Sequence, residues 1–265
     1  MAHESGKNGG VYGNSLVIHA CQVAWNDFNG AGCAASTTTG KVGALCSRIT
    51  TTAVGATTLM AAEDVALDLS TYEAAIWWGR SSVITALGDL HIHISETADC
   101  AAVDESLDWP VMAAATWKQC FGLFTGATTT RDVTVSVGLT QVVDLADATF
   151  DVDDFRAVSE ILGIKSWSLE YTASMLDVTD FANSGVSAFI PGITEWHGSF
   201  EGYKEGVPMA IGAEVYLVLG ETSVGTQVWL GKAIITNARP NVDHDGLVSY
   251  SYDFQGTGSL QAPTT

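Results

Sequence analysis

Few residues in this sequence are spaced for chemistry. His91 and His93 stand two apart in an alternating segment, so both side chains point to one face of an expected strand. Two imidazoles on one face could hold a metal ion if a third ligand joined them. The alternative is a polar strand face turned to solvent or to a neighbouring subunit. His197 lies between Trp196 and Gly198 and is expected at an interface or in solvent.

Known catalytic patterns are missing from the sequence. It contains no G-x-S-x-G elbow, no Walker loop, no G-x-G-x-x-G after a strand and no H-E-x-x-H. The five cysteines form no CxxC pair, which argues against zinc and favours buried or free thiols. Glycoside hydrolysis needs two carboxyl groups at a set separation, and the many acidic residues single out no pair. We therefore predict a protein that is not an enzyme and that has no cofactor.

The elements that would position any site are short β-strands. Twenty-seven glycines, abundant Thr and Val, and few long amphipathic runs predict an all-β fold. No apolar run reaches the roughly 18 residues of a membrane span, and the first residues lack the pattern of a signal peptide. These features predict a chain that folds in the cytoplasm where it is made.

The formal net charge is −19, from 11 basic and 30 acidic residues. Such a surface repels nucleic-acid phosphates, so specific DNA binding is not expected. A conduit for DNA should nevertheless be lined by negative or neutral groups, because a basic lining would retain the polymer. The alternative interpretation is that the acidic charge keeps a β-rich surface soluble.

One stretch, residues 163–206, organises the second half of the chain. In SWSLEYTA, Trp167, Leu169 and Tyr171 alternate with polar residues, and W-x-G-S-F-E-G-Y resumes the alternation after an FIPG turn. With the acidic DVTDF loop between them, these motifs closely resemble the tail-tube (major tail) proteins of long-tailed bacteriophages. The resemblance covers residues 1–16 and about 160–260, where its order of motifs is fairly specific.

Relatives of that family often begin with a "GKN-x-x-VY" segment that runs almost directly into the GIKSWSLEYTA strand. Here a long segment intervenes, and it predicts a second domain inserted at a surface turn. We expect residues 1–16 plus 157–265 to form a tail-tube-like β-barrel or sandwich, and residues 17–156 to form the inserted domain. Two domains in tandem are the alternative. Residues 204–212 could form a short helix at one end of the barrel.

The inserted segment resembles the galactose-binding-like jelly rolls of carbohydrate-binding modules. DLS-x-Y-x-x-x-x-W, W-x-x-x-x-F-x-L and F-x-V-D-D-F carry this resemblance, and they are mostly packing positions. It implies an antiparallel jelly-roll β-sandwich, in which an acidic residue near the closing strand often helps to hold a structural calcium. The candidate calcium ligands are Asp151, Asp153, Asp154 and Asp27, and a solvated acidic edge is the alternative. The candidate sugar platform is Trp77, Trp78 and Trp109, for each of which core packing is the alternative.

The resemblance implies a structural virion protein, a tail-tube subunit that assembles in the host bacterial cytoplasm into stacked, usually hexameric rings. Its partners would be copies of itself, other phage tail proteins and DNA that passes through the lumen without specific binding. The expected ring-to-ring contacts are Val11, Tyr12, Asp177, Val178, Thr179, Asp180, Phe181 and Asn183. The inserted jelly roll would decorate the outer surface. The alternatives are an adhesion module that binds host-surface glycans and a capsid decoration protein.

Overall fold

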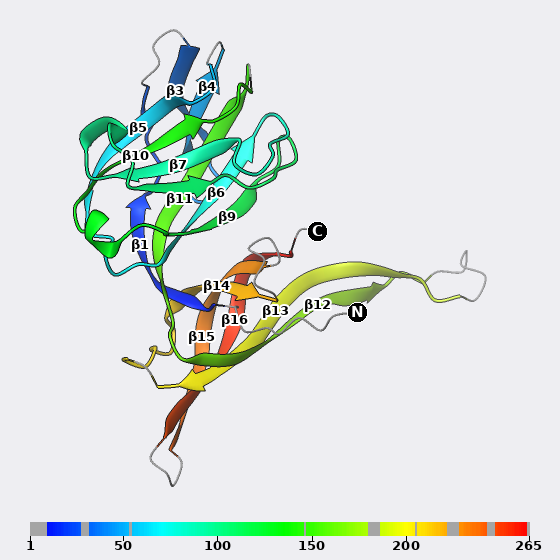
Figure 1. The fold of residues 1–265 in the computed structure, drawn as a ribbon. Helices are drawn as coiled ribbons and strands as arrows, with labels where there is room; N and C mark the ends of the chain where they lie inside the picture. The colour runs from blue at the N-terminus through cyan, green and yellow to red at the C-terminus, as the bar shows by residue number, and fades with distance from the viewer. Residues whose placement is uncertain are drawn as a thin grey trace, which may run out of the picture. The chain divides into compact units, whose positions relative to one another are not determined.

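The computed structural model describes residues 10–27, 32–52, 55–145, 147–179, 186–204, 206–221, 228–242 and 247–263. The chain divides into two compact units. Unit 1 comprises Met1–Gly13 and Ile161–Thr265, and unit 2 comprises Asn14–Glu160. Both are built from antiparallel strands (Figure 1), so the predicted all-β class is confirmed. None of the described residues forms a helix that could cross a membrane.

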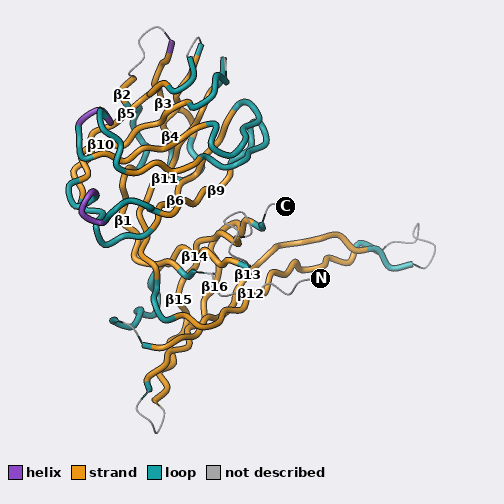
Figure 2. The backbone as a smooth tube through the Cα atoms, in the orientation of Figure 1, coloured by secondary structure: helices purple, strands orange, loops and turns teal. Residues whose placement is uncertain are grey.

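Unit 2 contains two antiparallel sheets, and its described residues include the short 3-10 helices Ala98–Cys100 and Thr128–Thr130 (Figure 2). One sheet has the strand order β2 (Asn26–Asp27), β5 (Thr58–Leu67), β10 (Thr134–Gln141), β7 (Leu90–Ser95), β8 (Glu105–Asp108). In the other, β11 (Thr149–Glu160) pairs with β4 (Leu45–Thr51) and β6 (Ala74–Ser81). The outer strands of that sheet are β3 (Cys33–Thr39) beside β4 and β9 (Lys118–Leu123) beside β6. Strand β1 (Tyr12–His19) also joins β11.

The core of unit 2 lies between its two sheets, whose strands contribute most of its buried apolar side chains. Trp77 is at its centre, with ring centroids 6.3 Å from Trp109 and 6.1 Å from Phe155. A buried ion pair joins Arg131 to Glu105 at 2.5 Å, and Glu105 also accepts the backbone N–H groups of residues 125 and 126. These partners satisfy a carboxylate that would otherwise be costly to bury.

Unit 1 is a sheet of long strands. Its order is β12 (Ile164–Asp177), β13 (Phe189–Tyr203), β16 (Val248–Gln261), β15 (Val228–Val242), β14 (Glu214–Gly220), with Tyr12 of β1 opposite Tyr216 of β14. The described strands form an open sheet, with β12 at one edge. The hairpins β12–β13 and β15–β16 extend well beyond the body of the unit (Figure 1).

The core of unit 1 is aromatic. Trp196 packs on Phe254 at 6.1 Å between ring centroids, and its indole N–H donates to the carbonyl of Gly258 at 3.1 Å. The indole lies over two glycines, Gly231 and Gly256, where any Cβ would collide with it. Both glycines are therefore required so that a large ring can lie flat on the strands.

Some sequence-based expectations need correction. The described part of residues 204–212 forms turns rather than the short helix. Strand β5 was not expected, because its TLMAAEDVAL sequence lacks clean alternation. Val11 and Tyr12 belong to the core of unit 1, with Val11 fully buried and its carbonyl accepting the N–H of Ile161. Their burial is incompatible with a ring-to-ring contact. Asp180, Phe181 and Asn183 lie outside the described residues.

Candidate functional site

The sequence-predicted aromatic platform is not assembled. Trp77 and Trp109 are 1% and 0% exposed and pack against each other, so neither ring can stack on a sugar. Trp78 points to the opposite face of β6 and is half-buried, with the ammonium of Lys41 5.0 Å from its ring centroid. Adjacent residues of a strand face opposite ways, which explains why only one member of the Trp pair reaches the outer face.

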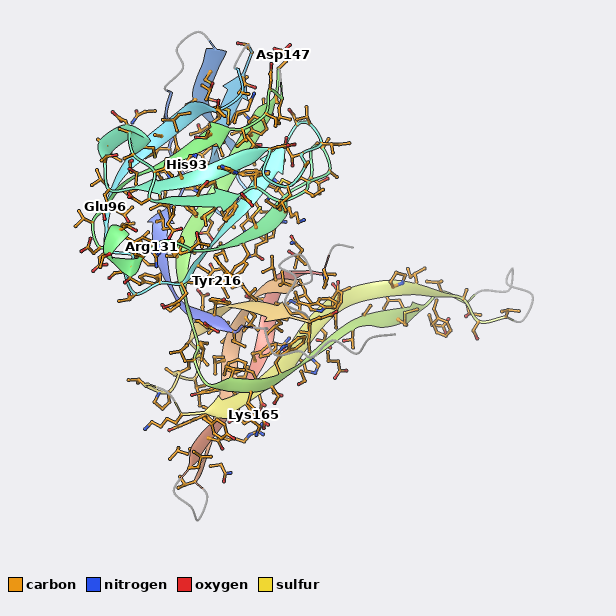
Figure 3. The ribbon with its side chains drawn as sticks, in the orientation of Figure 1. His93, Glu96, Arg131, Asp147, Lys165 and Tyr216 are labelled. Atoms are coloured by element: carbon orange, nitrogen blue, oxygen red, sulfur yellow. The ribbon has the colours of Figure 1, made fainter. Side chains whose placement is uncertain are left out.

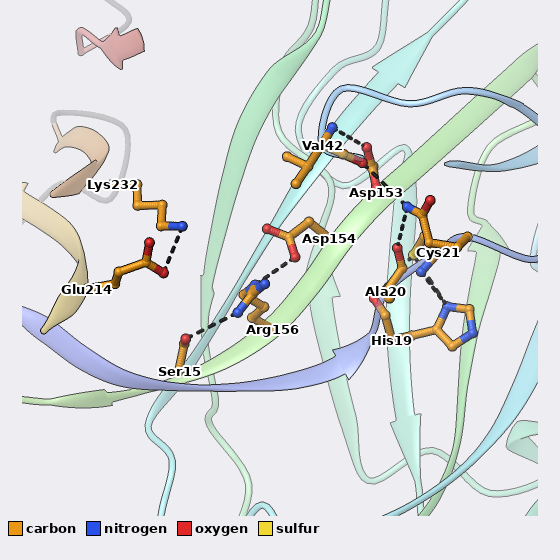
Figure 4. Close-up of polar contacts among 11 residues, drawn as sticks. Ser15, His19, Ala20, Cys21, Val42, Asp153, Asp154, Arg156, Glu214 and Lys232 are labelled. Atoms are coloured by element: carbon orange, nitrogen blue, oxygen red, sulfur yellow. Dashed lines mark hydrogen bonds and ion pairs between the residues drawn. The ribbon is translucent and has the colours of Figure 1, made fainter. Parts of the chain in front are cut away.

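The predicted calcium ligands are divided among separate partners. Asp151 bonds to two arginines. Asp153 accepts the backbone N–H groups of Lys41 and Val42, each at 2.7 Å, and Figure 4 shows the bond from Val42. Burial raises the pKa of Asp153, while those N–H groups act in the opposite direction.

Asp154 lies at a bulge with φ of 47°, and its carboxylate binds Arg156 at 2.6 Å. Asp27 is on β2, in the other sheet. Across the described residues, no three His, Cys, Asp or Glu are grouped to hold a metal ion.

Among the described residues, neither His91–His93 nor His197 has the set of ligands that a metal ion needs. His91 contacts Asp108 at 3.1 Å, and its ring meets that of His93 edge-on at 5.8 Å. Burial, with a contribution from His91, lowers the pKa of His93 to about 4. His197 is partly exposed and contacts Glu170 at 3.4 Å. These histidines make pairwise contacts on strand faces.

A Cys–His pair that sequence reasoning missed is present in unit 2. The Nδ1 atom of His19 lies 3.4 Å from the sulfur of Cys21 and also accepts the indole N–H of Trp25 at 3.0 Å. Cys21 is fully buried, and desolvation raises the pKa of its thiol well above the usual value. A neutral, enclosed thiol is a poor nucleophile, so this pair serves packing and turn geometry.

The arrangement with the most recognition chemistry is on the outer face of the β3-β4-β11-β6-β9 sheet. Asp151 of β11 stands opposite Arg48 of β4 and Arg80 of β6, and it bonds to both at 2.6–2.9 Å. The Arg80 guanidinium lies 4.5 Å above the Trp117 ring centroid. We name Arg48, Trp78, Arg80, Trp117 and Asp151 the Arg–Trp face. Sequence alone could not find it, because the strand register brings these residues together.

Unit 1 carries a second candidate site, the apolar ribbon. It comprises residues 171–177 of β12 and 189–195 of β13, which pair with each other beyond the core. Leu176 is opposite Ile190, and the next rung pairs Asp177 with Phe189, so successive apolar side chains face opposite ways. Side-chain sticks project to both sides of the extended β12–β13 hairpin (Figure 3). The exposed apolar side chains are Tyr171, Met175, Leu176, Phe189, Ile190 and Ile193.

Asp177, Val178 and Thr179, which the sequence predicts as ring-to-ring contacts, lie at the end of this ribbon. Val178 donates its backbone N–H to the carbonyl of Ala188 at 2.9 Å, and its side chain is exposed. Hydrogen bonds from the Thr179 hydroxyl and from its backbone N–H, the latter at 2.8 Å, lower the pKa of the Asp177 carboxyl. The DVT segment therefore continues an exposed hairpin and is available for contact.

The face of unit 1 opposite its core is polar. On β12 and β13, the hydroxyls of Ser168 and Ser199 lie 3.0 Å apart, and the neighbouring rungs carry more hydroxyl and carboxylate groups. The basic side chains of Lys165 and Arg239 contact Glu201 and Asp253, respectively. We name this set the polar face: Ser166, Ser168, Glu170, Thr172, Glu195, His197, Ser199, Glu201, Ser251, Asp253 and Gln255.

Comparison with known proteins gives likeness of shape at low sequence identity. No protein-family model and no curated protein sequence matches the chain. A family 11 carbohydrate-binding module of a Clostridium thermocellum cellulosomal cellulase matches at TM-score 0.40 and 15% identity, covering 56% of this chain and 95% of the module. A tandem pair of family 22 carbohydrate-binding modules from Paenibacillus barcinonensis matches at TM-score 0.35 and 10% identity, covering 98% of this chain and 100% of the tandem pair.

Proposed function

We propose that this chain is a structural subunit that assembles with copies of itself through unit 1, and that the assembly is a bacteriophage tail tube. The apolar ribbon is the observation that carries the proposal. An isolated two-stranded hairpin is at best marginally stable in water, and this one exposes large apolar side chains on both faces. Burial in a multimer would remove that surface from water.

A second copy is the occupant that the sheet favours. Strand β12 is an edge strand, and no described residue pairs with its outer side. At the other end, β14 pairs along its length with β15, and within the described residues its pairing with β1 is at Tyr12. Joining unlike edges of successive copies is a heterologous contact, which closes rings or continues as a filament. Such contacts would cover the edge and the ribbon together.

The tube form is supported by two further features. The first is the order of motifs in residues 163–206, which resembles tail-tube proteins. The second is the polar face, where serines, threonines and carboxylates predominate and the basic side chains of Lys165 and Arg239 contact acidic partners. A neutral to negative lining would let DNA pass without retaining it. We place the polar face toward the lumen and the assembly in the virion.

Electron microscopy of the purified full chain tests this function. The expected result is long hollow tubes, and the double variant Leu176→Lys, Ile190→Lys should remain monomeric with unit 2 folded. The matched control, Ile84→Lys with Leu87→Lys, changes two exposed apolar side chains of unit 2 and should still form tubes. Discrete trimers would instead indicate a decoration protein, and a monomeric wild-type chain would refute assembly altogether.

A second function, saccharide binding by unit 2, is favoured by the Arg–Trp face. Trp78 and Trp117 are half-buried on this face beside hydrogen-bond donors, a combination that suits stacking on a sugar ring with polar contacts at its rim. Gel mobility of the full chain in soluble polysaccharides tests it. Retardation that disappears in Trp117→Ala is expected, and unchanged mobility in all polysaccharides would refute it.

A further inference from the structure

Unit 2 is strongly acidic, yet in one of its sheets the acidic residues are confined to a single strand. Residues 14–160 carry three acidic residues for every basic one. None of the acidic residues is on β3, β4, β6 or β9, and of the five strands only β11 contributes any. The outer face of this sheet is therefore a local exception to a negative field.

The three aspartates of β11 are already engaged, Asp154 by Arg156 at 2.6 Å. Asp151 has a side chain 2% exposed and is held by two arginines, and the carboxylate of Asp153 is held by backbone N–H groups. One arginine in two-point contact would neutralise Asp151, as Arg48 does through Nε and Nη2. Arg80 offsets the charge that Asp153 keeps, and the ammonium of Lys41, 5.0 Å from the Trp78 ring centroid, leaves the face with one surplus positive charge.

That surplus charge is accessible. The side chains of Arg48 and Arg80 are 31% and 24% exposed. Each contacts Asp151 through Nε and Nη2, and Nη1 of each has no protein partner within the described ranges. Guanidinium N–H groups match the geometry of a carboxylate, so an anionic group is the fitting acceptor.

We propose that the Arg–Trp face binds an anionic polysaccharide whose sugar rings carry carboxylate groups. Arg48 and Arg80 receive the carboxylate through their Nη1 groups, while Trp117 and Trp78 contact the rings beside it. This inference rests on the proposed saccharide binding and specifies its ligand class. The rest of the acidic surface is screened beyond about 8 Å at physiological salt, so the local surplus decides the preference.

Affinity electrophoresis of the full chain at about 0.15 M salt tests the ligand class. The chain carries Leu176→Lys and Ile190→Lys, so that assembly adds no avidity. The gels contain polygalacturonate, neutral dextran, neutral xylan or double-stranded DNA. We expect retardation in polygalacturonate at least tenfold stronger than in dextran or xylan, and none in DNA.

Two variants locate the site. Arg80→Gln removes the surplus charge while Arg48 still pairs with Asp151, and we expect at least a tenfold loss of polygalacturonate affinity. Trp117→Leu, at a half-buried position before β9, removes the ring beside Arg80 but keeps Arg48, Arg80 and Asp151, and it should lower the affinity. Arg239→Gln in unit 1 is the matched control for charge and should change affinity less than twofold. Circular dichroism and melting of each variant confirm the fold.

The possible outcomes distinguish saccharide binding itself from the preference for an anionic saccharide. Equal binding to polygalacturonate and to dextran or xylan, reduced by Trp117→Leu, would keep saccharide binding and overturn the anionic preference. Retardation by DNA as strong as by polygalacturonate would show a site for any polyanion and overturn the ligand class. Polygalacturonate binding that Arg80→Gln and Trp117→Leu leave unchanged would overturn the site. Absence of binding to every saccharide would refute both claims.

Discussion

The two units treat their apolar surface differently. Unit 2 packs its tryptophans between two sheets, and its exposed apolar residues, such as Ile84 and Leu123, are scattered over loops and strand ends. Unit 1 buries Trp196 and Phe254 in its body but exposes a contiguous apolar run along paired strands. Scattered exposure is normal for a soluble domain, whereas a contiguous ribbon indicates a surface that is covered in the assembled state. Unit 2 thus covers most of its large apolar side chains by itself, whereas unit 1 leaves a contiguous run of them exposed.

The largest effect is expected at the buried ion pair of unit 2. Arg131→Met leaves Glu105 charged and buried with only backbone donors, which should lower the free energy of unfolding of unit 2 by about 3–5 kcal/mol. Differential scanning calorimetry should show a lower transition for unit 2 and an unchanged one for unit 1. Arg131→Lys is the control and should cost less. If both transitions fall together, the units do not unfold independently.

The next largest effect is expected in unit 1 and tests how far its stability depends on its aromatic core. Gly256→Val places side-chain atoms where the Trp196 indole lies, and the displaced ring should destabilise unit 1 by about 2–3 kcal/mol. Tube formation should fall with it, as micrographs would show. Gly55→Ala in unit 2, where a Cβ meets nothing within 4 Å, should change stability by less than about 0.5 kcal/mol. A Gly256→Val chain that assembles normally would contradict the role of the flat-lying ring.

The smallest effect is a pH dependence confined to unit 2. His93 has a folded-state pKa of about 4 because it is buried, whereas its unfolded value is 6.5. Below pH 6.5 the unfolded chain gains a proton that the folded chain does not, so stability should fall between pH 6.5 and 4 by about 2 kcal/mol and then level off. His93→Gln should flatten this part of the unfolding curve, and His197→Gln should not. An unchanged slope in His93→Gln would assign the dependence to other groups.

Local sequence chemistry predicted the strands well where alternation was clear. SWSLEYTA lies within β12, and the alternating segment that carries His91 and His93 forms β7, as expected. Period-two patterning is a property of neighbouring residues, so it is visible without any tertiary contact. Strand β5 was missed because both of its faces carry mixed residues.

The candidate sites were harder to predict because they depend on register and burial. In the sequence, Trp77, Trp78 and Trp109 are equally good candidates for a sugar platform. In the structure, only Trp78 of these three reaches the outer face. The sequence suggests a cation site at the carboxylates of Asp151 and Asp153. In the structure, strand pairing places Arg48 on one side of Asp151 and Arg80 on the other. A sequence cannot show which residue of a distant strand stands opposite.

By itself, the sequence determined the all-β class, the acidic charge and the alternation that separates a core face from a polar face. Only the tertiary structure decided which apolar residues stay exposed on the ribbon and which cations surround Asp151. The physical reason is that alternation is encoded by adjacent residues, whereas burial and cross-strand neighbours arise from pairing between segments far apart in the chain.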